Sequence, residues 1–297
     1  MSPESIGLAE LDLLWDFDDP AESERRFDVV VRRAHVENGG AQLAEALTQL
    51  ARAQGLQGRF GDARKSLDQA ARALRPEDRR GRVRLLLERG RVANSSGADG
   101  RGRGAFVEAW ELARAANDDG LAVDAAHMLG LVEPPDEASR WNQRAMELAR
   151  SSPDPVARRW VGSLANNMGW ARHDAGDDNG AIELFTLARD EWLADGRSNR
   201  ARIARWSIAR CLRSQGNLEA ALAAQQALLA ELDSVGESDG YVFEEIGECL
   251  LALGRADEAQ PHFARAYELL ADDPSLAEDR ARLMRLRALG GADQTEP

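Results

Sequence analysis

Residues 246–274, IGECLLALGRADEAQPHFARAYELLADDP, contain the pattern that decides the fold of this 297-residue chain. Small residues stand at Gly247, Ala259 and Ala266, and an aromatic residue stands at Phe263. Apolar residues recur at intervals of three and four on both sides of the breaker LGRADE, which is typical of two amphipathic helices joined by a turn. The stretch therefore predicts a helix hairpin whose two helices approach each other closely at the small residues.

The same pattern recurs along the chain at a steady interval. Gly169, for example, is followed twelve residues later by Ala181, and then by Phe185 and Ala188. We call the residue at the position of Gly169 and Gly247 the anchor of its repeat. The anchors are residues 11, 51, 90, 130, 169, 209 and 247, and the turn EPPDE after Gly130 is shorter than the others by about four residues. Since one such hairpin cannot bury its apolar face alone, the recurrence predicts a stack of hairpins.

The repeated pattern resembles the tetratricopeptide repeat, in which a small residue on helix A is followed by alanine, an aromatic residue and a small residue on helix B. The resemblance covers nearly the whole chain and implies an all-α solenoid of about seven helix hairpins, wound as a right-handed superhelix. This sequence departs from the family in its period of about 39 residues instead of 34, so we expect longer helices. The family's early tryptophan and tyrosine on helix A are also mostly missing.

We expect a single solenoid over residues 1–291, closed by a charged capping helix and followed by a short tail. The expected repeats are 4–38, 40–76, 78–117, 119–152, 154–195, 197–236 and 238–273, the capping helix is 274–291, and the tail is 292–297.

Composition and charge exclude several classes of protein. The formal net charge of −13 argues against overall binding to nucleic acid or to an anionic membrane. The N-terminus MSPESIGLAELDLLWDFDDP lacks the features of a signal peptide, and no apolar run reaches the ~18 residues of a membrane span, so a cytoplasmic protein is expected. Cys211 and Cys249 are too few for a disulfide framework and are interpreted as small core residues.

The segment NNMGWARHDAGDDNGAIELF, residues 166–185, raises the question of a metal site. Counted from Asp174, a calcium loop would need Asp or Asn, Gly and Glu where the chain has Gly176, Asn179 and Phe185. Because other repeats have their inter-helix turn at this place, we expect these polar residues to cap the next helix. No two of the four histidines have metal-ligand spacing, and no catalytic motif is present, so no metal, cofactor or catalytic residue is expected.

The resemblance also implies that the A helices line the concave surface, where a partner would bind. LANNMG, residues 164–169, is similar to kinesin-light-chain-like repeats, in which asparagines at this place hold an extended peptide. The residues expected to face the groove are Arg52, Arg84, Arg91, Asn94, His127, Asn166, Trp170, His173, Trp206, Arg210 and Arg213. Arginine recognises carboxylates, asparagine can bond a peptide backbone, and tryptophan is a frequent binding hot spot.

The sequence therefore predicts a non-enzymatic interaction scaffold that binds an extended, acidic peptide segment of a protein partner. Three alternatives stay open at this point. The predicted groove residues, called the stripe below, can be structural surface. The partner can bind on the convex side or an edge. The chain can also be a regulator whose solenoid changes shape on binding a peptide or ligand. The sequence leaves the oligomeric state open.

Overall fold

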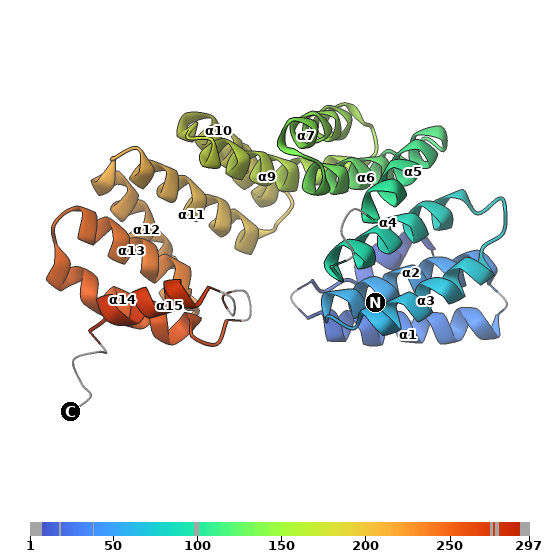
Figure 1. Ribbon diagram of the computed structural model, residues 1–297, viewed down its shortest axis with the longest axis horizontal. Coiled ribbons are helices and arrows are strands. Elements are labelled where there is room, and N and C mark those ends of the chain that lie inside the picture. The colour runs from blue at the N-terminus through green and yellow to red at the C-terminus, as the bar shows by residue number, and fades with distance from the viewer. Residues whose placement is uncertain are drawn as a thin grey trace. The chain divides into compact units, whose positions relative to one another are not determined.

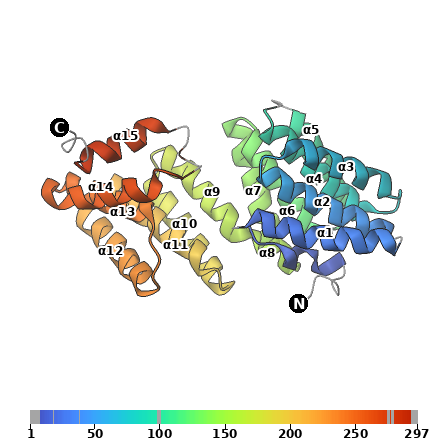
Figure 2. The same ribbon diagram turned by 90° about the horizontal axis from the view of Figure 1, so that it is seen from below.

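The computed structural model describes residues 8–17, 19–37, 39–97, 101–273, 276 and 279–291. All regular structure in these ranges is helical. The chain divides into two compact units, residues 1–161 and 162–297, and each consists of stacked helix hairpins. Figure 1 and Figure 2 show α2, α3 and α4 side by side in the first unit, and α12, α13 and α14 in the second. The fold is an all-α solenoid, as the sequence predicted.

The first unit contains the helices up to α8. They are the 3-10 helix η2 (Leu8–Leu14), α1 (Pro20–Val36), α2 (Gly40–Leu56), α3 (Phe60–Ala73), α4 (Arg79–Ser95), α5 (Arg101–Ala115), α6 (Asp119–Val132), α7 (Pro135–Ser151) and α8 (Pro155–Arg158). Each A helix packs against the B helix that follows it, in the pairs α2 with α3, α4 with α5 and α6 with α7. The expectation that all seven hairpins form one continuous solenoid stays a prediction.

The second unit begins within α9. Its helices are α9 (Trp160–Asp174), α10 (Asp178–Ala194), α11 (Ser198–Ser214), α12 (Leu218–Ser234), α13 (Gly240–Ala252), α14 (Ala256–Leu270) and α15 (Arg280–Leu289). The expected capping helix is therefore present as α15, which packs against α14 and buries Leu286. The tail at 292–297 lies outside the described residues, as do residues 4–7 of the first expected repeat.

The anchors are the points where the two helices of a hairpin meet. A Cβ added to Gly169 would lie 2.7 Å from Cε1 of Phe185, and one added to Gly247 would lie 2.8 Å from Cε1 of Phe263. Both rings are buried. Glycine at the anchor thus leaves room for the aromatic ring of helix B, and the ring fills the space that any side chain would need.

The other four repeats depart from this pattern. Leu67 and Gln225 take the place of the aromatic residue in the repeats anchored at Ala51 and Ala209. In the fourth repeat a Cβ on Gly130 would meet the side chain of Asn142, which stands four positions earlier than the phenylalanine of the glycine-anchored repeats. The shortened turn after Gly130 accounts for this shift. In the first repeat the place of helix A is taken by η2, seven residues long, because Asp19 caps α1 and Pro20 begins it. Leu11, the anchor of this repeat, is fully buried.

The turn between α9 and α10 has the cap geometry that the sequence indicated. Gly176 lies in the left-handed region at φ 79°, directly after α9. The Asp177 side chain then accepts a hydrogen bond of 3.0 Å from the backbone N–H of Gly180 and so caps α10. The same hydrogen bond lowers the pKa of Asp177. The interpretation of residues 174–179 as a turn and helix cap is confirmed. Among the described helices, none has both the length and the apolar character that crossing a bilayer requires.

Candidate functional site on the A helices

All eleven predicted groove residues lie on A helices. They are Arg52 on α2, Arg84, Arg91 and Asn94 on α4, His127 on α6, Asn166, Trp170 and His173 on α9, and Trp206, Arg210 and Arg213 on α11. In the first unit, Arg52, Arg84 and Arg91 form interhelical ion pairs, and His127 lies beside one of these pairs. Most of the other predicted residues gather around an aromatic row in the second unit.

Arg84 is enclosed by carboxylates in the first unit. Its side chain is 7% exposed, and its Nη2 atom donates a 3.0 Å hydrogen bond to Asp12 of η2. Its Nε atom lies 3.1 Å from Glu45 of α2, which is also buried. Burial raises the pKa of Glu45, although the neighbouring Arg84 and Arg80 act to lower it. Arg84 therefore holds η2 and α2 together and presents little charge to a partner.

Arg52 and Arg91 share the buried carboxylate of Glu88. Arg52 Nη1 lies 3.6 Å from Glu88, and its guanidinium lies over the rings of Trp15 and Phe17. Arg91 pairs with Glu88 on its own helix and with Asp124 on α6. Although burial lowers the pKa of Arg91, these two carboxylates raise it by more. The positive charge predicted for this part of the stripe is neutralised within the protein.

His127 and the two predicted asparagines make fewer contacts. His127 Nδ1 is buried without a hydrogen-bond partner in the described part of the chain, and the ring centroid lies 5.1 Å from that of Trp160. Burial lowers the pKa of His127 to about 4, so this ring is neutral at pH 7. Asn94 is exposed. Asn166 donates a 3.4 Å hydrogen bond from Nδ2 to Asn167 Oδ1.

An aromatic row runs across three successive A helices of the second unit. The ring centroids of Trp170 on α9 and Trp206 on α11 are 6.0 Å apart, and those of Trp206 and Tyr241 on α13 are 6.3 Å apart. Trp206 Nε1 donates a 3.0 Å hydrogen bond to the backbone carbonyl of Tyr241. The guanidinium of Arg210 lies 5.7 Å from the Trp206 ring centroid. Trp170, Trp206 and Arg210 thus lie next to one another, and Tyr241 extends the row.

Two arginines beside the row share one carboxylate. Arg210 Nη1 lies 2.9 Å from Glu245, and Arg213 Nε lies 2.8 Å from the same side chain. The hydrogen bonds that Arg213 donates to Glu245 raise the pKa of Arg213. Glu245 is buried, whereas the Arg210 side chain is 34% exposed. With two guanidinium groups on one carboxylate, this patch keeps a local positive charge.

Glu244 and Glu248 on α13 are paired with the capping helix. Arg282 bonds Glu244 at 2.6 Å, and Arg285 pairs with Glu248. The guanidinium of Arg282 also lies 5.2 Å from the Tyr241 ring centroid. The end of the aromatic row is therefore covered by α15, and its open side faces the other way, toward the start of α11 and α13.

An open groove of about 650 Å³ lies on that side of the row. It is formed by the first turns of α11 and α13 and the last turns of α12 and α14. Ile203, Trp206, Val242 and Leu269 supply apolar surface, and Arg202 lies at its edge beside Glu237, at 2.7 Å. The Ile203 side chain is 52% exposed although it is large and apolar.

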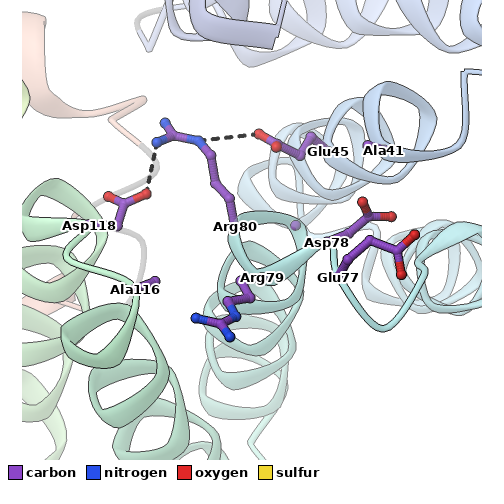
Figure 3. Close-up of a pocket in the computed structure, with 9 residues that line it drawn as sticks. Ala41, Glu45, Glu77, Asp78, Arg79, Arg80, Ala116 and Asp118 are labelled. Atoms are coloured by element: carbon purple, nitrogen blue, oxygen red, sulfur yellow. Dashed lines mark hydrogen bonds and ion pairs between the residues drawn. The ribbon is translucent and has the colours of Figure 1, made fainter.

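The first unit has a smaller, charged cavity of about 360 Å³ at the start of α4. Arg80 bridges it, because its Nη1 lies 2.8 Å from Asp118 and its Nε lies 3.5 Å from Glu45 (Figure 3). Glu77 and Asp78 add two further carboxylates to the lining. This cavity lacks the apolar surface that the groove of the second unit offers.

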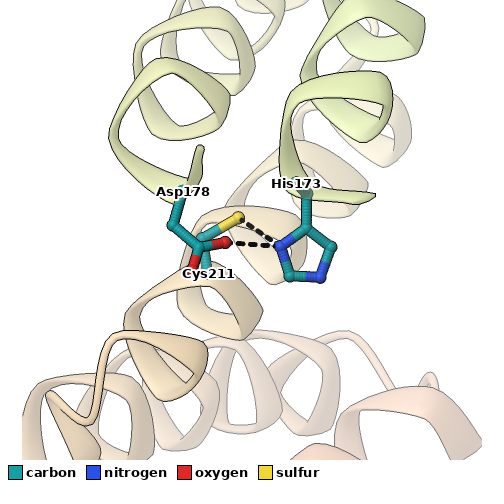
Figure 4. A group of neighbouring side chains, drawn as sticks. All are labelled: His173, Asp178 and Cys211. Carbon is teal, nitrogen blue, oxygen red and sulfur yellow. Dashed lines mark hydrogen bonds and ion pairs between the residues drawn. The ribbon is translucent and has the colours of Figure 1, made fainter. Parts of the chain in front are cut away.

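His173 lies at the end of α9, beside the Trp170 end of the aromatic row. Its Nδ1 atom is 2.6 Å from Asp178 Oδ1 and 3.7 Å from the Sγ atom of Cys211 on α11 (Figure 4). Its ring makes an edge contact with Trp170 at 5.5 Å between centroids. Both Cys211 and Cys249 are free and buried. Burial, together with the nearby Asp178, raises the pKa of the Cys211 thiol to about 12.

Comparison with known proteins finds similarity in structure but not in sequence. No protein-family model matches the chain, and no curated protein is similar to it. A signal-transduction ATPase with numerous domains (STAND) and a tetratricopeptide repeat sensor, from Pyrococcus horikoshii, matches 96% of this chain with a TM-score of 0.70 at 14% identity. The chain spans 44% of the length of that structure.

Two further solved structures match with lower TM-scores. A tetratricopeptide repeat protein from Parabacteroides merdae matches with a TM-score of 0.52 at 16% identity, over 94% of this chain and 97% of that one. The tetratricopeptide-like repeats of a Podospora anserina kinesin light chain match with a TM-score of only 0.36 at 17% identity, over 79% of this chain and 98% of that one. The Pyrococcus horikoshii and Parabacteroides merdae structures agree with the hairpins and their anchors described above. They show that this chain has the fold of the tetratricopeptide-repeat solenoids.

Proposed function

We propose that this chain is a non-enzymatic protein–protein interaction scaffold whose binding surface is the aromatic row of Trp170, Trp206 and Tyr241 with the groove beside it. The observation that carries this proposal is the combination of a row of adjacent aromatic rings with a 650 Å³ apolar groove at its side. Interfaces are enriched in exposed aromatic side chains, and an apolar pocket that accepts one anchor side chain is a common hot spot.

The chemistry of the surface defines the partner segment. Ile203, Val242 and Leu269 would contact a large apolar side chain of an extended peptide. Arg210 and Arg213 have one carboxylate between them, so an acidic residue of the peptide would complete their pairing. The partner segment is therefore an extended peptide with an acidic residue near an apolar one.

The arginines of the first unit contribute less to this proposal. Arg84 and Arg91 already have two carboxylate partners each, and both are largely buried. An acidic peptide would have to displace these partners, and breaking a buried ion pair costs about 3–5 kcal/mol. The second unit is the better binding surface for this reason.

A random peptide library displayed on phage and selected on the full-length chain tests the proposal. We expect enriched peptides to combine an acidic with a large apolar residue, and we expect Ile203→Asp to weaken their binding at least tenfold. Leu193→Asp is the matched control, because Leu193 is 53% exposed in the same unit and does not line the groove. Enriched peptides that bind the Ile203→Asp variant and the wild type equally would place the binding surface elsewhere.

A second candidate is a regulator that changes shape on binding a peptide or ligand. The similarity in fold to a STAND protein with a tetratricopeptide repeat sensor supports this second candidate. Small-angle scattering of the chain with and without an enriched peptide separates the two, because a scaffold keeps its radius of gyration and a sensor of this kind changes it.

A further inference from the structure

Three side chains with metal-ligating atoms meet at the junction of α9, α10 and α11. His173 comes from the last turn of α9, Asp178 begins α10, and Cys211 lies in the last turn of α11 (Figure 4). Their nearest ligand atoms all lie within 4.8 Å of one another. Sequence spacing does not reveal the group, because the thiol comes from the next repeat.

The arrangement is not that of a catalytic relay. A nucleophile–base–acid relay uses both ring nitrogens of the histidine, one toward the nucleophile and one toward the carboxylate. Here Asp178 and Cys211 both face Nδ1, as the two dashed lines in Figure 4 show. A metal ion at this place would bond to all three groups at once.

We propose that His173, Asp178 and Cys211 form a binding site for a zinc ion. Thiolate sulfur, imidazole nitrogen and carboxylate oxygen are the three ligand types that Zn²⁺ takes in proteins, and the thiolate disfavours Mg²⁺ and Ca²⁺. Three protein ligands leave the fourth tetrahedral position for water or another ligand.

The distances fit this ion after a small adjustment. Tetrahedral zinc with ordinary bond lengths places nitrogen and sulfur about 3.5 Å apart and nitrogen and oxygen about 3.3 Å apart. The observed distances from His173 Nδ1 are 3.7 Å to Cys211 Sγ and 2.6 Å to Asp178 Oδ1. The carboxylate would therefore turn away from the ring by about 0.7 Å, which the side chain of the first residue of a helix can do.

Burial and access also suit an ion. Cys211 is fully buried, and the side chains of His173 and Asp178 are 14% and 15% exposed, so the group lies just below the surface. Arg210, next to the thiol in sequence, pairs with Glu245, a carboxylate that it shares with Arg213. An ion can reach the site from solvent and would then be held in a largely water-excluded place.

The next repeat provides an internal comparison. Cys249 is also buried and occupies the place of Cys211 one hairpin later. There Arg213 stands at the position of His173, and Leu218 stands at the position of Asp178. Since the fold accommodates a cysteine there without either neighbour, packing alone does not explain the histidine and the aspartate beside Cys211.

The test is competition for zinc chloride between a chromophoric chelator and the full-length chain, freed of affinity tags and of bound metal. We expect one zinc ion per chain with sub-micromolar affinity. Loss of an outer-shell partner of a metal site lowers the metal affinity by about 10–100-fold. Cys211→Ser and His173→Gln should each lower the zinc affinity by more than this. Cys249→Ser should bind as the wild type does.

Cobalt(II) provides a second measurement that reports the ligand directly. We expect a thiolate-to-cobalt charge-transfer band in the wild type and in Cys249→Ser, and no such band in Cys211→Ser. Circular dichroism measures whether each variant is folded. If a ligand variant is not folded, Asp178→Asn is used in its place. A wild type without a stoichiometric zinc ion, or a folded Cys211→Ser variant with wild-type affinity, would refute the site.

Discussion

The ring of Phe263 occupies the space above the backbone of Gly247, with its Cε1 atom 2.8 Å from the point where a Cβ on Gly247 would be. A side chain at residue 247 must therefore push the ring or the helix away. We expect Gly247→Leu to overpack this contact and to lower the free energy of unfolding by about 1–3 kcal/mol. Urea denaturation followed by circular dichroism measures the change.

Gly61→Ala is the control for this substitution. Gly61 lies in the first turn of α3, and nothing lies within 4 Å of the position of an added Cβ. Alanine is a better helix former than glycine, so this variant should be as stable as the wild type or up to ~1 kcal/mol more stable. Equal stability of Gly247→Leu and the wild type would mean that the anchor is not a packing contact.

His127 should make the stability of the chain depend on pH in the mildly acidic range. Burial lowers the pKa of the ring from 6.5 to about 4, with Arg91 and Arg52 acting in the same direction and Asp124 in the opposite one. Below pH 6.5 the unfolded chain binds a proton that the folded chain does not. Stability should therefore fall as the pH falls from 6.5 to about 4, by on the order of 2–3 kcal/mol in total.

The pH dependence can be assigned by comparing two histidine variants. His127→Gln removes the buried ring and should flatten the fall in melting temperature between pH 6.5 and pH 4. His35→Gln changes an exposed ring and should keep the wild-type slope. If His127→Gln keeps the full slope, the acid sensitivity comes from another group.

The fold could be predicted because its determinants recur. Gly90, Gly169 and Gly247 each stand sixteen residues before a buried phenylalanine, and this spacing is visible without coordinates. The replacement of the aromatic residue by Asn142 also follows from the four missing residues after Gly130. The shortening of the first helix A to η2 could not be predicted, since it depends on how Asp19 and Pro20 start α1 against it.

The candidate site was only partly predictable, because a charge pattern on one helix does not show what the next helix presents. Arg52 and Arg210 stand directly after their anchors, and they meet Glu88 and Glu245, which stand two residues before the anchor of the following repeat. A comparison of charges between consecutive repeats at these two positions would have revealed the pairs. The groove beside Ile203 arises from four helix ends and has no signal in any single repeat.

The pairing of Arg210 and Arg213 with Glu245 determines how the charge of the second unit must be tested. Reversing both arginines would leave the buried Glu245 beside two further negative charges, so the loss of stability would obscure any effect on binding. The triple variant Arg210→Gln/Arg213→Gln/Glu245→Gln instead removes one net positive charge and leaves no unpaired ion. We expect it to fold with nearly wild-type stability, since replacing all members of a buried ion cluster is often close to neutral.

Binding by the triple variant should weaken in a way that depends on salt. An acidic peptide would lose one charge-assisted contact of about 1.5–3 kcal/mol, which corresponds to a loss of affinity of at least about tenfold. The difference from the wild type should shrink at high salt, because ions screen partly exposed charges. Fluorescence titration with a peptide enriched on the wild type, at low and high salt, measures both effects. Equal affinities at low salt would show that the residual positive charge beside Trp206 does not take part in recognition.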